Sequence, residues 1–531
     1  MDITYLLFRL GSVSVSARVA ARSGVQGPSC QQRWSLVDGP LRRDAGVVTE
    51  NRPFAAVRET HIGVVFLVGD RVYKLKKPVN LGFLDFSTPE LRRAACHREV
   101  ELNRRLTPDV YLGVATVSDV DDAPGEPLVV MRRMPDDRRL STLVRAGVPL
   151  SDEIIRLARV LAAFHAGAER GPHIDAEGTC EALSDRWEAS FAQVYEVGAG
   201  VVSDESRAEI VRRTREFLAG REALFASRIA EGRIVDGHGD LLADDIFVLD
   251  DGPRVLDCIE FDDRLRRLDG LDDIAFLAMD LERLGAPELG ELLLDRYAEY
   301  SGDPAPAALR AHYVAYRAFV RVKVACLRHA QGDASAAEEA CVYADIAVRH
   351  LRRGEVRLVL VGGLPGSGKT TIAGLVADEL GAVLLSSDRL RKELAGLDPE
   401  RHATAPYRSG IYAREHTERT YTELLRRAGE LLERGESVVL DASWSGAGER
   451  ELARKVAERT YSTFVSLRCT APAAVTETRL RTRTGSLSDA DPTIAHAMAA
   501  DAASWPQAVD IDTSGTPAAA LTEALRMVRP R

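Results

Sequence analysis

Hydrophobic and polar positions in the first part of the chain predict a small β-rich region with one helix. Two runs rich in β-formers, 62–68 and 71–76, flank a Gly-Asp dipeptide that accepts positive φ in a hairpin turn. A helical pattern then starts at Thr88-Pro89, where Thr is a suitable N-cap and Pro fits the first helical position. A further strand is predicted over 126–134.

The rest of the chain shows two successive patterns. From Ser151 to about His350 the periodicity is helical, interrupted by two short strand runs, "DIFVLDD" and "PRVLDCIEF". A charged stretch, "RHLRRGEVR", then leads to the strand "LVLVGG", after which strands and helices alternate. Such alternation predicts a parallel sheet with helices on both faces. We therefore predict a tail over 1–45, an α+β domain over 46–350 and an α/β domain over 351–531.

Composition narrows the class of protein. The 531 residues are 45% hydrophobic and 28% charged, as in a globular protein with more than one core, and the longest apolar runs are strand-length. The net charge of −10 disfavours general binding to nucleic acid or to an anionic membrane. Seven scattered cysteines without CxxC pairs indicate core thiols in a reducing cytoplasm. We expect a cytoplasmic protein that does not enter a membrane.

The stretch "GGLPGSGKTT" matches the P-loop pattern and lies between a predicted strand and a predicted helix. In such loops glycines let backbone N–H groups surround the β-phosphate, Lys reaches the β/γ oxygens and Thr binds Mg²⁺. ATP and Mg²⁺ are therefore the predicted cofactors, with Thr370 as a metal ligand. The residues predicted to bind nucleotide are Gly363, Leu364, Pro365, Gly366, Ser367, Gly368, Lys369, Thr370 and Thr371.

Three further positions could complete this site. Asp388 and Arg391 follow the next strand, where ligands of parallel sheets bind, so Asp388 could accept a proton from a substrate hydroxyl while Arg391 orients substrate. The alternative is a helix N-cap with a solvated arginine. Asp441 closes the strand "SVVLD", a place suited to an acidic residue that steadies Mg²⁺.

Arginines in "ETRLRTRTG" could form a lid over the phosphates, although an exposed helix end would have the same composition; they are Arg479, Arg481 and Arg483. Taken together, residues 355–531 resemble the small P-loop kinases that phosphorylate a hydroxyl. That group includes gluconate kinase, chloramphenicol phosphotransferase and the kinase half of polynucleotide kinases. The resemblance implies transfer of the γ-phosphoryl group of ATP.

A second acidic loop, "GHGDLLADDIFVLDD", has the spacing of another phosphotransfer site. Kinases of the protein-kinase type use an Asp as proton acceptor, a metal-binding Asn five residues later and a metal-binding Asp on a following strand. Here Asp240, Asp245 and Asp257 occupy these places. Asp is still a hard oxygen ligand for Mg²⁺, but its extra charge near the γ-phosphate could slow transfer.

With its His-Gly-Asp loop, the region 55–345 resembles the aminoglycoside phosphotransferase and choline kinase group. The resemblance implies that Lys74 or Lys76 reaches the nucleotide phosphates and that Glu99 pairs with that lysine. The phrases "ETHIGVVFLVGDRVYKLKK" and "DCIEFDDRLRRLDGLDDIAFLAMDLE" are similar to a bacterial family that fuses an aminoglycoside-phosphotransferase-like domain to a P-loop kinase-like domain. The fold class expected is thus an α+β protein-kinase-like domain followed by an α/β P-loop kinase domain.

The leading hypothesis is an ATP- and Mg²⁺-dependent kinase that acts on a hydroxyl of a small molecule. In this hypothesis the protein could be bifunctional, with one active site in each domain. The alternatives are a kinase of nucleic-acid 5′ hydroxyls, which the acidic net charge disfavours, and an ATP-gated sensor whose N-terminal domain does not catalyse. The pattern names neither the acceptor nor an oligomeric state.

Overall fold

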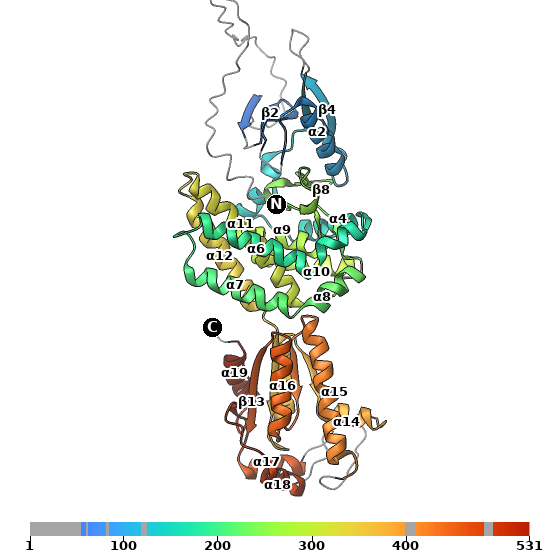
Figure 1. Cartoon of the computed structure of the whole chain (residues 1–531), viewed down its shortest axis with the longest axis vertical. Helices are drawn as coiled ribbons and strands as arrows, with labels where there is room; N and C mark the ends of the chain where they lie inside the picture. The colour runs from blue at the N-terminus through green and yellow to red at the C-terminus, as the bar shows by residue number, and fades with distance from the viewer. Residues whose placement is uncertain are drawn as a thin grey trace, which may run out of the picture. The chain divides into compact units, whose positions relative to one another are not determined.

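The computed structural model describes residues 55–59, 62–80, 84–117, 125–398, 409–482 and 492–529 (Figure 1). The chain divides into two compact units, one ending at Met134 and the other beginning at Pro135. The tail predicted over 1–45 lies outside the described residues. Among the residues described, no helix has both the length and the apolar character needed to cross a membrane.

The first unit is an antiparallel sheet with a helix packed on it. The strands lie in the order β1-β2-β3-β5-β4, and the helix α2 contacts β4 and β5. The predicted hairpin is present, with Val68 paired to Arg71 across the turn, and Thr88 caps α2 through a 3.3 Å hydrogen bond from the amide of Leu91. The element bounds are β1 Ala55–Glu59, β2 Gly63–Val68, β3 Arg71–Lys76, α2 Pro89–Asn103, β4 Tyr111–Val117 and β5 Glu126–Arg132.

The second unit begins with a mainly helical part that also carries two short antiparallel strand pairs, β6 with β9 and β7 with β8. The acidic stretch of the sequence starts directly after β6 and runs through β7 to the turn before β8. The helices are α3 Leu140–Arg145, α4 Ser151–Gly167, α5 Pro172–Asp175, α6 Cys180–Val197, α7 Asp204–Ala219, α8 Glu222–Ala230, α9 Gly270–Arg283, α10 Pro287–Ser301, α11 Ala307–Ala330 and α12 Ala336–Arg353. The strands are β6 Ile234–Asp236, β7 Ile246–Leu249, β8 Gly252–Val255 and β9 Arg267–Asp269.

The last part of the second unit is a parallel sheet in the order β11-β12-β10-β13-β14. Its apolar core joins the central strands to α13 and α19, and Figure 1 shows α15 and α16 beside the sheet. The strands are β10 Arg357–Gly362, β11 Val383–Ser386, β12 Val438–Asp441, β13 Thr463–Thr470 and β14 Val509–Asp512. The helices are α13 Lys369–Leu380, α14 Ser387–Leu394, α15 Arg414–Glu433, α16 Ala447–Arg459, α17 Ala473–Thr482, α18 Pro492–Asp501 and α19 Pro517–Val528.

The predicted fold class is confirmed, with small differences in its elements. The charged stretch "RHLRRGEVR", where the sequence places the boundary between the two domains, is helical as far as Arg353, because α12 buries His350 and Leu351 before Gly354 ends it. Strands β1, β4, β6, β9 and β14 were not predicted. Each is an edge strand of its sheet, and edge strands pack against neighbours on one side only, which weakens their hydrophobic pattern.

Candidate active sites

The P-loop of the second unit connects the buried end of β10 to the first turn of α13. Gly363 has φ 143° and a Cβ there would lie 2.5 Å from the Ser367 hydroxyl, so only glycine fits. Gly366 has φ 79° and a Cβ there would lie 2.8 Å from the carbonyl oxygen of Thr476. The loop therefore holds the left-handed turns that aim backbone N–H groups at an anion.

Thr370 and Asp441 meet at the carboxyl edge of the sheet. Strands β10 and β12 run parallel with Val361 opposite Asp441, so the end of β12 lies beside the P-loop. The Thr370 hydroxyl donates a 2.9 Å hydrogen bond to Oδ2 of Asp441. Burial raises the pKa of Asp441 above its ordinary value; Lys369 and Thr370 oppose this rise, and Asp388 adds to it. Lys369, Thr370 and Asp388 therefore all lie close enough to Asp441 to influence it.

The donor set at this edge fits a divalent cation. Oδ1 of Asp441 is buried and has no hydrogen-bond partner, so one oxygen is available to a ligand or its water. Hydroxyl and carboxylate oxygens are the ligands that Mg²⁺ prefers, and the nucleotide phosphates supply the others. Within the described residues no group of three or more His, Cys, Asp or Glu side chains could hold a metal without such help.

Arg479 of α17 is the one predicted lid arginine that reaches the P-loop among those described. Its guanidinium donates to the carbonyl oxygen of Thr513 at 2.6 Å and lies 3.4 Å from the carbonyl oxygen of Gly366. Arg481 instead pairs with Glu477 at 3.6 Å on the surface. Arg483 lies outside the described residues.

Asp388 and Arg391 lie on α14, but they face different surroundings. Asp388 is half-buried in the first turn of α14. The N-cap residue of this helix is Ser386, so the alternative interpretation of Asp388 as an N-cap is wrong. Arg391 is buried and donates to the Ile411 carbonyl at 3.1 Å and to the Thr417 hydroxyl at 3.0 Å. These hydrogen bonds of Arg391 join α14 to the start of α15, so Arg391 positions α14. Its predicted contact with substrate stays a prediction.

The first unit contains an ion pair of the kind implied by the kinase resemblance. Glu99 of α2 accepts from Lys74 at 3.1 Å through one oxygen and from Lys76 at 2.8 Å through the other. The two lysines are alternate residues of β3 and therefore project from the same face. Burial alone would raise the pKa of Glu99, but the two ammonium groups outweigh it and hold the pKa below its ordinary value. Both lysines predicted as alternatives thus bind the same carboxylate.

In the second unit, the loop carrying Asp240 is fixed by its backbone. The amides of His238 and Gly239 donate to the two oxygens of Asp273 at 2.7 and 2.9 Å. Burial raises the pKa of Asp240 to about 6, with Arg321 opposing the rise and Asp257 adding to it. A carboxylate with a pKa near 6 is a better proton acceptor than an ordinary aspartate.

The two predicted metal ligands lie after this loop. Asp257 is exposed and has φ 68°, one of the few described non-glycine residues in the left-handed region. Such strain is typical of functional positions. Asp245 is half-buried, and its carbonyl oxygen accepts the amide of Leu256 at 3.0 Å, which ties it to the strand that leads into Asp257.

The residues that hold the Asp240 loop were not predicted. Asp273 is fully buried in α9 and also contacts Nε2 of His165 at 3.1 Å, while Nδ1 of His165 contacts the Tyr297 hydroxyl at 2.9 Å. His165 is itself buried, so the contact with Asp273 lies inside the helical part. A signal was present in the two aspartates opening "GLDDIAFLAM", since carboxylates at the buried start of an apolar helix need partners.

Comparison with known proteins shows the family. The chain is 48% identical over 472 residues to Uncharacterized protein Rv2004c of Mycobacterium tuberculosis (strain ATCC 25618 / H37Rv), covering 89% of this chain and 95% of the relative. Uncharacterized protein Mb2027c of Mycobacterium bovis (strain ATCC BAA-935 / AF2122/97) matches over the same length at the same identity. The chain belongs to the family of these proteins. Residues 358–504 also match the family described as AAA domain.

Solved structures of kinases are also similar to parts of the chain. A sugar kinase from Janibacter sp. HTCC2649 is 23% identical, with a TM-score of 0.26 and coverage of 33% of this chain and 94% of that one. A choline/ethanolamine kinase family protein from Mesorhizobium loti is 16% identical, with a TM-score of 0.35 and coverage of 57% and 92%. The family match at 358–504 and the order of strands and helices confirm the fused architecture predicted from the sequence.

Proposed function

We propose that this protein is an ATP-dependent phosphotransferase that moves the γ-phosphoryl group to a hydroxyl of a small molecule, with the P-loop domain as its principal active site. The observation that carries the proposal is the 2.9 Å hydrogen bond between Thr370 and Asp441 beside Lys369. This bond places a hydroxyl and a buried carboxylate together at the end of a P-loop strand, the arrangement needed by a magnesium nucleotide.

In the proposed reaction the chain positions the nucleotide and neutralises charge. The P-loop amides and Lys369 hold the β- and γ-phosphates, and Arg479 adds positive charge where α17 meets the loop. Thr370 and Asp441 would hold Mg²⁺, which supplies neutralisation of the phosphate charge when bound. Asp388 accepts the proton of the attacking hydroxyl, and Arg391 keeps α14 in place through α15.

A second phosphotransfer site in the kinase-like region is also proposed. It is supported by the pKa of about 6 for Asp240, which suits a proton acceptor, and by the strained backbone of Asp257. Asp245 and Asp257 would hold Mg²⁺ there, with Asp245 in the place where related kinases have Asn. The paired Lys74, Lys76 and Glu99 of the first unit are consistent with binding of nucleotide phosphates.

A small-molecule acceptor in the cytoplasm is proposed in preference to a nucleic-acid end. The net charge of −10 would repel a polyanion along most of the surface, whereas a small substrate needs only local complementarity.

The experiment is transfer of label from γ-labelled ATP into a fractionated pool of cytoplasmic metabolites by the full-length protein. Wild type is compared with Lys369→Ala and Asp240→Ala, and with the surface controls Arg389→Ala and Asp250→Ala. If each of the first two variants loses a different labelled product while the controls lose none, the chain has two transfer sites. Loss of all label in Lys369→Ala alone leaves the P-loop domain as the only enzyme. Label that survives in Lys369→Ala and depends on Asp240 refutes the P-loop as the principal site.

A further inference from the structure

A strained turn follows strand β12 at the carboxyl edge of the P-loop sheet. Its residues are Ser443, Trp444 and Ser445, and Trp444 has φ 52° although its side chain is bulky. A left-handed backbone at such a residue costs about 1–3 kcal/mol and persists only where the surrounding structure holds it. Strain of this kind gathers at active sites and ligand clamps, so the turn is a candidate for contact with a ligand.

The register of the sheet places this turn between the P-loop and the predicted proton acceptor. Strand β12 lies between β11 and β10, and Asp441 is aligned with a residue of each. Two residues beyond the aligned positions are Asp388 after β11, Ser443 after β12 and Gly363 after β10. The amide of Gly363 donates to the carbonyl oxygen of Ser443 at 3.3 Å. Ser443 therefore lies between the phosphate-binding loop and the first turn of α14.

The backbone and the side chain of Ser443 face different neighbours. Its carbonyl oxygen is bound by the P-loop, whereas its hydroxyl lies 3.3 Å from the Tyr421 hydroxyl and 3.5 Å from the Ser445 hydroxyl. Tyr421 is one helical turn after Thr417 on α15, and Thr417 accepts from Arg391 of α14 at 3.0 Å. The hydroxyl of Ser443 thus belongs to the side of the site formed by α14 and α15, and not to the P-loop side.

Neighbouring elements fix the turn through its backbone. The Tyr421 hydroxyl accepts the amide of Trp444 at 3.3 Å, and Arg450 donates to the Trp444 carbonyl oxygen at 2.8 Å. The carbonyl oxygen of Ser445 accepts the amide of Ala503 at 2.9 Å. Among the described residues the two serine hydroxyls have only the long hydrogen bonds of 3.3 Å and 3.5 Å, and both serines are half-buried. The turn is therefore rigid, and its hydroxyls keep capacity for a stronger partner.

Two buried arginines beside this turn are engaged with uncharged groups. Arg391 donates to the Ile411 carbonyl oxygen at 3.1 Å and to the Thr417 hydroxyl at 3.0 Å. Arg450 donates to the carbonyl oxygen of Trp444 at 2.8 Å. An anionic acceptor could pair with neither guanidinium unless these buried bonds broke.

Glu449 on α16 acts on one of these arginines. Burial lowers the pKa of Arg450, and the carboxylate of Glu449 opposes that fall. The negative charge of Glu449 therefore already has a positive neighbour, and a cationic acceptor gains little from it. The groups that the turn itself presents are hydroxyls, which favours an uncharged acceptor.

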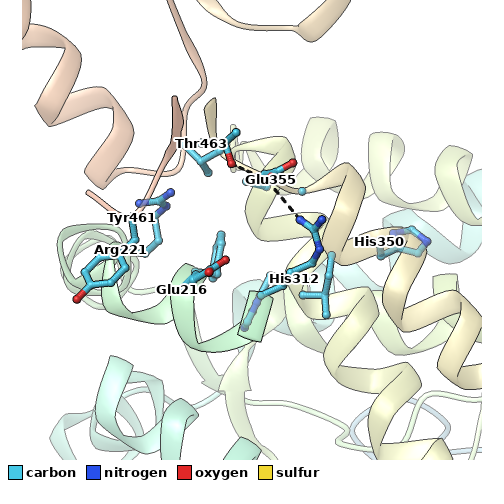
Figure 2. A pocket seen from close by; sticks show the side chains of 13 residues that line it. Glu216, Arg221, His312, His350, Glu355, Tyr461 and Thr463 are labelled. Atoms are coloured by element: carbon cyan, nitrogen blue, oxygen red, sulfur yellow. Dashed lines mark hydrogen bonds and ion pairs between the residues drawn. The ribbon is translucent and has the colours of Figure 1, made fainter. Parts of the chain in front are cut away.

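At the amino end of the same sheet the helical part packs against the strands. Figure 2 shows Glu355 next to Thr463 at the start of β13, joined by a 2.5 Å hydrogen bond, with Arg221 and Tyr461 nearby. The pocket that these side chains line has a volume of ≈ 40 Å³, which holds only a few water molecules. A substrate of the P-loop site is thus expected at the carboxyl edge, where ligands of open α/β sheets bind.

We propose that Ser443 and Ser445 bind the acceptor of the P-loop site and select an uncharged molecule with neighbouring hydroxyl groups, a polyol or a neutral sugar. A serine hydroxyl both donates and accepts, so the turn can bond to a hydroxyl in either direction. One acceptor hydroxyl gives its proton to Asp388 while the turn holds its neighbour. Its oxygen bonds to the γ-phosphorus as the bond to the β,γ-bridging oxygen breaks, which yields a phosphate ester and ADP. This inference rests on the transfer reaction proposed above and adds the class of acceptor.

Transfer of label from γ-labelled ATP to single acceptors by the full-length protein tests the proposal. Xylitol and D-ribose are the uncharged probes, D-gluconate is the anionic probe and D-glucosamine is the cationic probe. Product that disappears in Lys369→Ala is assigned to the P-loop site. We expect such product from xylitol or D-ribose, with kcat/KM at least about tenfold lower for the charged probes because the turn leaves their charge without a partner.

Variants of the turn then test its contact with the acceptor. Ser443→Ala and Ser445→Ala should each raise the KM for the uncharged acceptor by about tenfold, the loss expected for one hydrogen bond in a buried site. The KM for ATP should stay within about twofold of wild type, because the P-loop contacts are retained. Thr422→Ala is the matched control: it removes an exposed hydroxyl that bonds to the Glu418 carbonyl oxygen at 2.8 Å, one residue after Tyr421 on α15.

A higher KM for the uncharged acceptor in both serine variants, with Thr422→Ala at the wild-type value, supports the proposal. A preference for D-gluconate or D-glucosamine overturns it, as does an unchanged KM in the serine variants or an equal loss in Thr422→Ala. A raised KM for ATP in the serine variants also overturns it, because the turn would then act on the nucleotide.

Failure of this inference and failure of the transfer reaction give different results. Lys369-dependent label that enters the metabolite pool but none of the four probes overturns the proposed class of acceptor and leaves the reaction standing. Absence of Lys369-dependent label from the pool refutes the P-loop reaction itself, and the inference falls with it.

Discussion

Replacing Asp441 by Asn should separate stability from nucleotide binding. Asp441 is 4% exposed, and its Oδ2 accepts from Thr370 while its Oδ1 has no hydrogen-bond partner. An unsatisfied buried polar atom costs about 1–3 kcal/mol. Asn keeps an oxygen for Thr370 and removes the buried charge, but its NH₂ group meets no acceptor. We therefore expect the nucleotide-free protein to be stabilised, or changed by no more than about 1 kcal/mol.

Magnesium nucleotide should affect the two proteins differently. In wild type, ligand at a hundredfold its Kd adds about 2.7 kcal/mol to the free energy of unfolding. In Asp441→Asn most of the Mg²⁺-dependent part of this gain in the free energy of unfolding should be lost. P-loop turnover should also fall by about 10–100-fold, the usual cost of removing a residue that holds the metal through an outer contact. Thermal unfolding with ATP alone, with ATP and Mg²⁺, and without ligand gives the three comparisons.

The difference in stability between Asp441→Asn and wild type should also depend on pH, in a direction that follows from the pKa of Asp441. Because the pKa of Asp441 is raised in the folded state, the folded protein binds the proton more tightly, and stability falls as pH rises above the ordinary value of 3.8. The advantage of Asn should therefore be present at neutral pH and disappear below about pH 4. Asp378→Asn on the exposed face of α13 is the control. Equal stabilisation by magnesium nucleotide and unchanged turnover in Asp441→Asn would refute the reasoning.

Two other variants and one pH profile test the remaining geometry. Glu99→Gln leaves the buried Lys76 without its carboxylate and should destabilise the protein by about 3–5 kcal/mol in denaturant unfolding. Because the pKa of Glu99 is lowered in the folded protein, this difference in stability should be present above pH 4.5 and shrink as the pH falls below that value. Product that depends on Asp240 should decrease about tenfold per pH unit below about 6, where the carboxylate is protonated, while product that depends on Lys369 should lack that limb. Asp273→Ala removes the acceptor of two loop amides and should lower Asp240-dependent transfer by about 10²-fold, with P-loop turnover retained.

A control or a contradicting outcome can be named for each of these three predictions. Glu101→Gln, an exposed neighbour on α2, should change stability little, and an equal effect in both variants would mean that the Glu99 pair is not responsible. A single pH profile for both labelled products would contradict separate proton acceptors. Loss of P-loop turnover in Asp273→Ala would show general unfolding and not a local change at the Asp240 loop.

The P-loop could be predicted from sequence because its chemistry is local. The glycines, Lys369 and Thr370 are consecutive, and their conformation follows from a strand, a turn and a helix in order. Asp441 could be placed as well, since the carboxyl ends of parallel strands share one edge of the sheet. The side chain of Arg391 could not, because its partners Ile411 and Thr417 lie twenty and twenty-six positions later, just before α15 and within it.

The Asp240 loop shows the same limit. Its acidic residues have a characteristic spacing, but Asp273 and His165, which fix it, come from helices before and after it. Nothing in the local sequence of α4 indicates that His165 contacts Asp273. The pKa of about 6 for Asp240 also comes from burial and from charges on α11, so only the packed structure produces it.

By itself the sequence determined the two classes of fold, the order of most elements, the P-loop and the positions of the candidate carboxylates, because each depends on periodicity or on spacing within a short segment. Tertiary structure alone decided which of these side chains meet: that Lys74 and Lys76 share Glu99, that Thr370 bonds Asp441, and that the Ser443 hydroxyl lies beside that of Tyr421. Contacts of this kind depend on how helices pack against sheets, and that packing is set by the whole buried surface and not by any one segment.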